Sequence, residues 1–364
     1  MKALVVDDSQ FMRTVVRTAL EEADYAVVEA SDGEQAVQAT RRHDPDVITM
    51  DVEMPTMNGI DATEAIMSTQ PTPILMLSAH TERGAEATFD ALSKGAVDFL
   101  PKPDGEVSTD TGDLAIDLVE KVETVRSADV SAVTPEADST GGETTAPAAP
   151  AATGDATADD VESSVGEVTT EYVENPTVVV GASTGGPKVL QRVLYDLPRD
   201  IDARVLIVQH MPENFTARLA ERLDSVSSYE VREAEDGTRV GAGEVVLARG
   251  GKHMRVDSYG GGRIRLALTD EEKVHGVRPA IDVTMHSAAT TIDDPLVGVA
   301  LTGMGQDGAR GITAIKQAGG RTVAQDEASS PVWGIPGSAV ETGAVDTVVG
   351  ATEIADAVVR ALEA

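Results

Sequence analysis

Five polar residues among the first 102 positions stand where apolar segments end, and their types suit the handling of a phosphoryl group. Asp7 and Asp8 follow the segment ALVV, and Asp51 follows DVITM. Three carboxylates brought together form a hard oxygen site of the kind that binds Mg²⁺. Ser78 and Lys102 follow two further apolar segments, and can hold phosphoryl oxygens. The set predicts an aspartate nucleophile that works with a metal ion, although strand-end acids can also merely cap helices.

A second set of residues suits acyl transfer. The motif GASTGG, residues 181–186, follows an apolar segment and precedes a helix that opens with proline, which is the context of a nucleophile elbow. Ser183 is the predicted nucleophile, His210 after VLIVQ the predicted base, and Asp307 in ALTGMGQDG the group that orients the base. Triads are defined by geometry and roles, so their order along the chain is free. The backbone N–H of Thr184 is a natural oxyanion donor, and the GMGQDG loop can supply a second.

Some motifs in this second set have other interpretations. The GASTGG turn could instead cradle a phosphate group. His253 and His275 stand in segments rich in glycine and charge, and we expect them at the surface. His43, His80 and His286 receive no role. The triad hypothesis therefore depends on one histidine of six.

The elements that must position the first set alternate between short apolar runs and segments with helical periodicity. Five such units in about 125 residues predict an α/β domain with a five-stranded parallel sheet. Ligands of such sheets bind beyond the carboxyl ends of the strands, where the polar residues stand. The expected strands are residues 3–7, 25–30, 46–51, 73–78 and 97–102.

The second half of the chain shows the same alternation of apolar runs and segments with helical periodicity. This predicts a doubly wound, Rossmann-like α/β domain. One β-rich insert interrupts it, with a strand at 244–250 and then a hairpin that turns at Gly260–Gly262. Ser183, His210 and Asp307 each follow one of the predicted parallel strands. The expected strands are residues 177–182, 203–210, 295–303, 321–327 and 345–350.

A segment without basic residues separates the two halves. Residues 127–176 hold eleven acids and no Lys or Arg, and the rest is mostly Ala, Thr, Ser, Gly and Pro. Such a composition cannot bury enough apolar surface to offset its ordering entropy, which predicts a disordered linker. The expected organisation is a first domain over 1–122, an acidic linker over 123–176 and a second domain over 177–364.

Composition excludes several classes of protein. The net charge of −33 argues against nucleic-acid binding, which needs clustered positive charge. There are no cysteines, which excludes disulfides and thiolate metal sites. The sequence lacks the long apolar run of a membrane span and begins without a secretory leader, so we expect a cytoplasmic protein with no membrane insertion. Only 8 residues are lysine, and an acid-rich surface of this kind indicates adaptation to concentrated salt.

The motifs VVDDSQFMR, MDVEMPTMNG and DFLPKP resemble the receiver domain of two-component response regulators, which has a flavodoxin-like fold. The resemblance implies that Asp51 is the phosphoacceptor and that Lys102 binds the phosphoryl oxygens. It implies a switch pair of Ser78 and Phe99. It implies a Mg²⁺ site made by Asp7, Asp8, Asp51 and the backbone carbonyl of Glu53.

The whole chain resembles the chemotaxis response regulator protein-glutamate methylesterases (CheB family). Its acid-rich composition points to a haloarchaeal member of that family. GASTGG, VQHMPENF, AEDGTRV, GKHMRV, LTGMGQDGARG and AQDEASSPVWGIP carry the resemblance. It implies hydrolysis of glutamate methyl esters, and deamidation of certain glutamines, on methyl-accepting chemotaxis receptors. It implies a triad of Ser183, His210 and Asp307, an oxyanion donor in the Met304 N–H, and no cofactor in this domain. It also implies a chemotaxis histidine kinase as phosphodonor and activation by phosphorylation.

Two rival functions stay open at this point. The chain could be a receiver-gated serine hydrolase of another ester or amide. It could also be a response regulator whose second domain binds DNA or protein without catalysis, although no helix-turn-helix or basic stripe is visible.

Overall fold

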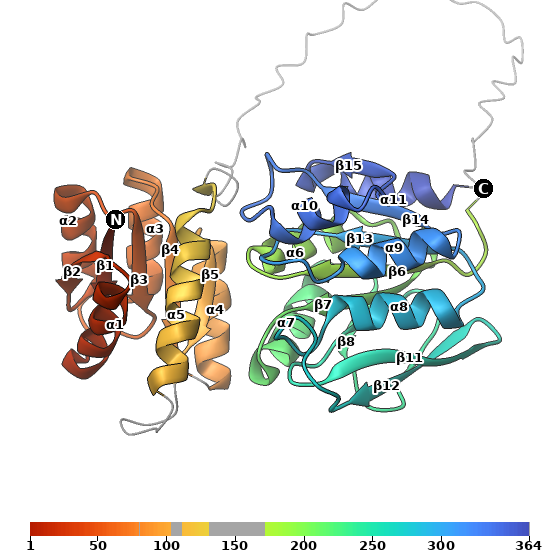
Figure 1. Cartoon of the computed structure of the whole chain (residues 1–364), viewed down its shortest axis with the longest axis horizontal. Helices are drawn as coiled ribbons and strands as arrows, with labels where there is room; N and C mark the ends of the chain where they lie inside the picture. The colour runs from red at the N-terminus through yellow and green to blue at the C-terminus, as the bar shows by residue number, and fades with distance from the viewer. Residues whose placement is uncertain (80, 103–110, 131–171, 364) are drawn as a thin grey trace, which may run out of the picture.

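The computed structural model describes the chain except for residues 80, 103–110, 131–171 and 364 (Figure 1). Most of the expected linker therefore lies outside the described residues. Helix α5 (Thr111–Arg126) runs four residues past the expected boundary at 122, and its Val125 is fully buried. Tyr172 pairs with Glu363 at the other end of the second unit. The division into 1–122, 123–176 and 177–364 stays a prediction.

The first unit contains the predicted five-stranded parallel sheet, in the order β2-β1-β3-β4-β5. Its strands are β1 (Lys2–Val6), β2 (Ala26–Ala30), β3 (Val47–Asp51), β4 (Ile74–Ser78) and β5 (Asp98–Pro101). Its helices are α1 (Gln10–Glu22), α2 (Gly33–His43), α3 (Gly59–Thr69), α4 (Glu82–Ser93) and α5. Every residue of β3 and β4 is buried, as continuous apolar runs in a parallel sheet require.

Side-chain caps define where the helices of the first unit begin. Ser9, Asp32, Asn58 and Thr81 each accept the backbone N–H of the residue three positions further on. These short polar side chains satisfy N–H groups that have no partner within the helix. The chain therefore leaves each strand, turns over a cap and enters the helix at a fixed point. This fixes the positions of the strand ends that carry Asp7, Asp8 and Asp51.

The second unit is built on a seven-stranded parallel sheet in the order β15-β14-β13-β6-β7-β10-β8. Its strands are β6 (Thr177–Ala182), β7 (Arg204–Gln209), β8 (Glu230–Glu233), β10 (Glu244–Leu247), β13 (Leu296–Ala300), β14 (Arg321–Gln325) and β15 (Thr347–Val349). Its helices are α6 (Gly186–Asp196), α7 (Glu213–Val226), α8 (Ile281–Thr291), α9 (Ala309–Gln317), α10 (Gly334–Glu341) and α11 (Ile354–Leu362). Val178 and Val180 of β6 pack into one core and Val179 into another, so helices cover both faces and the doubly wound prediction is confirmed.

The β-rich insert is smaller than predicted. Residues 244–247, expected in the insert, form β10, which pairs in parallel with β7 in the main sheet. The edge strand β8 was not predicted, because its alternating charges hide its single buried valine. The hairpin is confirmed: β11 (His253–Gly260) and β12 (Arg263–Thr269) pair in antiparallel, with β9 (Arg239–Val240) beside them. Gly261 and Gly262 have φ angles of +59° and +72°, which glycine adopts without strain.

The two units meet where α4 packs against α7, and β5 and α5 contribute further contacts (Figure 1). Phe215 of α7 is fully buried at this junction. Its ring stacks on Phe99 with centroids 4.4 Å apart and meets Phe89 edge-on at 6.5 Å. Arg222 pairs with Asp90 at 3.0 Å at the rim. Among the described residues, no helix combines the length and the apolarity needed to cross a bilayer.

Charge is distributed unevenly between the units, and this leads to a prediction about salt. Residues 1–126 carry −15, whereas the longer segment 177–364 carries only −7. Added salt screens repulsion most where like charge is densest. On dilution from molar salt, we expect the first unit to lose structure before the second.

Hydrogen exchange of peptides from β3 and β6 measures the two units separately, and fluorescence of Trp333, the only tryptophan, follows the second. Loss of protection in β6 at a higher salt concentration than in β3 would contradict the argument from charge density. An absence of any salt response would contradict adaptation to salt as well.

Candidate functional site

Ser183 lies in a tight turn between β6 and α6, as the elbow prediction requires. Its side chain is 8% exposed, and its backbone N–H donates to the carbonyl of Thr302 at 3.0 Å. Gly185 closes the turn with a φ of +78°. A Cβ on Gly303 would lie 2.6 Å from the Cβ of Ser183, so this glycine allows the two loops to touch. The strand, turn and helix thus present the serine at the carboxyl edge of the sheet.

His210 follows β7 directly, and its imidazole pairs with the carboxylate of Asp307. The distance between His210 Nε2 and Asp307 Oδ2 is 2.8 Å. Because Nε2 is engaged with the carboxylate, Nδ1 is the nitrogen left to accept a proton. Among the described residues, no hydrogen bond joins the Ser183 hydroxyl to His210. Such bonds are often long before a substrate binds.

Asp307 is 2% exposed, and its charge is compensated from three sides. Its carboxylate accepts the backbone N–H of Ile281 at 2.7 Å and of Asp282 at 2.9 Å, in addition to the contact with His210. Burial by itself raises the pKa of Asp307, but these hydrogen bonds outweigh burial and hold the pKa below its usual value. The carboxylate therefore stays charged behind the imidazole.

A cavity of 760 Å³ brings the second predicted set together. Ser183, Thr184, His210, Met304 and Asp307 all line it. These residues come from three separate strand–helix connections of the parallel sheet. A nucleophile, an oriented base and candidate oxyanion donors therefore face one space, which is the arrangement that acyl transfer needs.

The other histidines depart in part from expectation. His253 was predicted at the surface, and this is wrong: it is fully buried, and its two ring nitrogens contact the carbonyl of Glu272 and the N–H of Ala280. The alternation of HMRVDS gave no signal for this burial, because it places His253 on the strand face of Arg255 and Asp257, which are less buried. His275 was also predicted at the surface, and this is confirmed: the residue as a whole is exposed, although its side chain, which lines the cavity, is only 16% exposed. His286 is exposed on α8 and His43 ends α2, whereas His80 lies outside the described residues.

The first predicted set also converges. Carboxylate oxygens of Asp7, Asp8 and Asp51 lie within 4.8 Å of one another. The ammonium of Lys102 is 2.7 Å from Asp51 Oδ1 and 2.8 Å from Asp7 Oδ2. Burial raises the pKa of Asp51 to about 6, against the opposing effect of Lys102. Burial opposes the charge of Lys102, but Asp51 and Asp7 outweigh it and raise the pKa of its ammonium.

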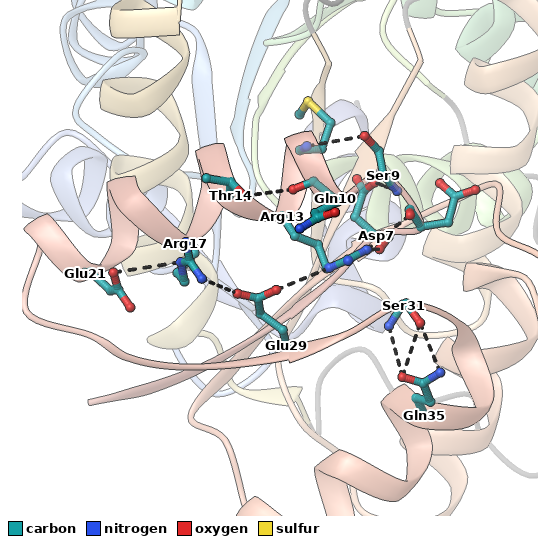
Figure 2. A network of polar contacts seen from close by, with 12 residues as sticks. Asp7, Ser9, Gln10, Arg13, Thr14, Arg17, Glu21, Glu29, Ser31 and Gln35 are labelled. Atoms are coloured by element: carbon teal, nitrogen blue, oxygen red, sulfur yellow. Dashed lines mark hydrogen bonds and ion pairs between the residues drawn. The ribbon is translucent and has the colours of Figure 1, made fainter.

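Arg13 on α1 supports this acidic cluster, although no motif in the sequence singled it out. Its Nη1 donates to the backbone carbonyl of Asp7 at 2.7 Å and to that of Asp8 at 3.1 Å. Its Nε contacts Glu29 at 3.3 Å, and Arg17 pairs with the other oxygen of that carboxylate (Figure 2). Arg13 thus fixes the backbone of the loop whose side chains form the cluster.

In the part of the chain that the structure describes, only Phe99 of the remaining predicted residues of the first unit contacts the second unit. The hydroxyl of Ser78 is buried and donates to the carbonyl of Gly84 at 3.0 Å. Phe99 is 6% exposed and stacks on Phe215. The side chain of Glu53 points to Arg83 at 3.7 Å and is well exposed, so only its backbone is available to the acidic cluster.

Comparison with known proteins identifies both units. A response regulator receiver domain model matches residues 3–108, and a CheB methylesterase model matches residues 178–358. A protein-glutamate methylesterase/protein-glutamine glutaminase from Haloarcula marismortui is 54% identical over 99% of this chain and 97% of the relative. Another from Natronomonas pharaonis is 52% identical over 98% of this chain and 96% of the relative. The chain belongs to the CheB methylesterase family.

The chain is therefore a hydrolase of this family joined to a response-regulator receiver, and both predictions are confirmed. The crystal structure of the Thermotoga maritima CheB methylesterase catalytic domain is 40% identical and covers 50% of this chain and 97% of that chain, with a TM-score of 0.49. The haloarchaeal relatives agree with the acid-rich composition of this chain.

The receiver touches the methylesterase domain beside the candidate nucleophile. The hydroxyl of Thr184 donates to Asp98 Oδ2 of β5 at 2.6 Å. Asp98 is 7% exposed and also pairs with Lys121 of α5. Thr124 of α5 contacts the sulfur of Met304. Asp98, Phe99 and Lys121 line the same cavity as Ser183, so the receiver forms part of the cavity wall.

The contact between Gly303 and Ser183 yields a prediction for the methylesterase domain. Besides Ser183, a Cβ on Gly303 would lie 2.5 Å from the Cδ1 of Ile335. Overpacking of this kind typically costs a core about 1–3 kcal/mol. We expect Gly303→Ala to lower the free energy of unfolding by about this amount, measured by denaturation followed through Trp333 fluorescence.

Gly260→Ala is the matched control, because a Cβ there has nothing within 4 Å. Equal stability of the two variants would show that the loops have more room than the structure gives them.

Proposed function

We propose that this chain hydrolyses glutamate methyl esters on methyl-accepting chemotaxis receptors, with release of methanol, and deamidates specific receptor glutamines. The relatives' names give the two reactions. The observation that carries the proposal is the His210–Asp307 pair, which shares one cavity with Ser183. We further propose that the protein works in the cytoplasm, that a chemotaxis histidine kinase supplies its phosphoryl group, and that the catalytic domain needs no cofactor.

Each of the three residues has a defined step in this mechanism. His210 Nδ1 removes the proton of Ser183 Oγ as the oxygen attacks the ester carbonyl. Collapse of the tetrahedral intermediate breaks the bond to the methoxy oxygen, which takes the proton from His210 and leaves as methanol. Water then attacks the acyl-enzyme by the same route, releasing glutamate and free Ser183. For a glutamine substrate the leaving group is ammonia. Asp307 holds the imidazole in its tautomer and stabilises its positive charge.

Two backbone N–H groups are available to stabilise the anionic intermediate. Among the residues that the structure describes, no acceptor is found for the N–H of Thr184 or of Met304, and both residues line the cavity. Donors held ready in a site of this kind are worth roughly 3–4 kcal/mol each in the transition state. This supports the assignment of Thr184 and Met304 to the oxyanion site.

The triad assignment predicts the behaviour of two variants. Ser183→Ala removes the nucleophile and is expected to reduce methanol release from methylated receptor membranes by several orders of magnitude. Asp307→Asn leaves His210 in the wrong tautomer and is expected to cost roughly 10⁴-fold. Methanol release by the intact chain, with and without a small phosphodonor, is the experiment that tests the function.

Labelling with a fluorophosphonate separates the rival functions. Reaction at Ser183 without methanol release would indicate a hydrolase of another ester or amide. The absence of both would indicate a domain that binds without catalysis. Near-normal turnover in either variant would contradict the triad.

We assign the phosphoacceptor role in the receiver to Asp51. The three carboxylates within 4.8 Å of one another fit a hard divalent cation such as Mg²⁺. Asp7, Asp8, Asp51 and the carbonyl of Glu53 would hold it, and when bound the ion neutralises charge on the phosphoryl oxygens. Lys102 already contacts Asp51 and is placed to bind a phosphoryl oxygen there.

The contacts at the junction support a receiver that inhibits the methylesterase domain until phosphorylation. Ser78 and Phe99 are the proposed switch pair, and Phe99 stacks on Phe215 of the other domain. A movement of Phe99 therefore removes an interdomain contact directly. Asp98, next to it in sequence, places a buried carboxylate on Thr184, and a negative charge there opposes the developing oxyanion. Phosphorylation thus weakens the docking of the receiver and moves the charge of Asp98 away from Thr184.

This inhibition predicts that Asp98→Asn raises activity without phosphorylation. The substitution removes the charge that accepts the Thr184 hydroxyl across the junction, and a hydrogen bond to a charged group contributes about 1.5–3 kcal/mol. We expect about a tenfold rise in basal turnover, the factor that corresponds to roughly 1.4 kcal/mol of weakened docking, and a smaller stimulation by phosphodonor.

Asp90→Asn is the matched control, because its pair with Arg222 lies at the exposed rim and such pairs contribute about 0–1 kcal/mol. Basal turnover that is unchanged in Asp98→Asn, or raised equally in both variants, would contradict the role of Asp98.

A further inference from the structure

A second pair of histidine and aspartate stands behind the first. His275 Nε2 contacts Asp282 Oδ2 at 2.9 Å, just as His210 Nε2 contacts Asp307. Nitrogen and oxygen atoms of His275, Asp282 and Asp307 lie within 4.8 Å of one another. Both imidazoles line the cavity that holds Ser183. The mechanism described above makes no use of the second pair.

The two aspartates hold each other's helices. Asp307, which precedes α9, accepts the first N–H groups of α8. Asp282, in the first turn of α8, accepts the N–H of Gly308 at 2.9 Å and of Gly311 at 2.7 Å at the start of α9. The carboxylate of Asp307 therefore caps α8, which carries Asp282. The carboxylate of Asp282 caps α9, which follows Asp307 in the chain. The position of Asp307 is fixed by Asp282, because Gly308 is its neighbour in the chain.

Asp282 needs His275 to complete this arrangement. The side chain of Asp282 is 9% exposed, and its Oδ1 is occupied by the two backbone donors. His275 donates to the other oxygen, and without that donor a largely buried carboxylate oxygen lacks a partner, which is costly. The carboxylate would then turn toward the cavity water and loosen its hold on α9.

The backbone around His275 is shaped to present this imidazole. Val274 and Val277 exchange two backbone hydrogen bonds, of 3.1 and 3.2 Å, around a two-residue turn. His275 has a φ of +53°, in the left-handed region that is uncommon for residues other than glycine but in which His, Asn and Asp are enriched, and Gly276 follows at +76°. The buried His253 binds both ends of the segment, at Glu272 and Ala280. A non-glycine residue at positive φ that is held from both sides indicates a functional constraint.

We propose that His275 is a positioning residue, which acts through Asp282 to hold Asp307 and the GMGQDG loop in register with His210. The proposal rests on the proposed function. In this role His275 donates one hydrogen bond from Nε2 to Asp282 and transfers no proton to the substrate. Loss of that donor shifts the orienting carboxylate rather than a substrate contact, so it lowers kcat and leaves KM nearly unchanged.

Two amide variants test this. In His275→Gln the amide nitrogen reaches the position of Nε2, whereas in His275→Asn it falls short by one methylene. Asn is well tolerated at positive φ, so the shorter variant keeps the turn. We expect His275→Asn to lower kcat by about tenfold to a hundredfold, the range for groups that orient a catalytic side chain from behind. His275→Gln should stay within about threefold of the parent, because it restores the donor.

Three readouts are measured on the full chain: kcat and KM for methanol release, the rate of fluorophosphonate labelling of Ser183, and the thermal midpoint. His286→Asn is the matched control, since His286 is exposed on α8. A parallel fall in kcat and labelling rate in His275→Asn alone supports the proposal. A change in KM alone, equal impairment of the Asn and Gln variants, or no change in either overturns it. A parent chain that neither releases methanol nor reacts at Ser183 overturns the proposed function instead, which distinguishes the two failures.

Discussion

The catalytic half of this protein is organised around one requirement: the carboxylate of Asp307 must stay charged in a place from which water is almost excluded. A buried carboxylate is tolerated only when donors surround it. Here the donors are an imidazole and two N–H groups from the start of α8. That demand fixes where α8 begins and how it meets α9. It also fixes the position of His210 at the end of β7.

The receiver solves a related problem with a different set of groups. Its acidic cluster is kept together by the ammonium of Lys102 and by Arg13, which holds the backbone of Asp7 and Asp8 rather than their side chains. In the methylesterase domain, backbone N–H groups provide most of the hydrogen bonds that stabilise the buried carboxylate of Asp307. The difference suits the proposed roles. A cation site needs carboxylate oxygens that can be freed for a metal, whereas an orienting carboxylate should be bound on all sides.

Much of this could be predicted from the sequence, because parallel strands bring their carboxyl ends to one edge whatever the details of packing. That rule alone placed Ser183, His210 and Asp307 near one another, and likewise Asp7, Asp8 and Asp51. The same rule could not place His253 or His275, since neither follows a parallel strand. It could not find Asp98 either, because its contact with Thr184 joins two domains. β10 was assigned to the wrong sheet because a short apolar run gives no sign of its partner strand.

Because Phe99 stacks on Phe215, one side chain takes part in two equilibria, the switching of the receiver and the docking of the two domains. Under the proposed assignment, Phe99 reports the state of Asp51 and at the same time contributes to domain docking. Thermodynamic linkage is reciprocal, so whatever free energy phosphorylation withdraws from docking, docking withdraws from phosphorylation. Under that assignment, the methylesterase domain acts as an effector of its own receiver. Under the same assignment, a receiver detached from the methylesterase domain has a different phosphorylation equilibrium from the receiver of the intact chain.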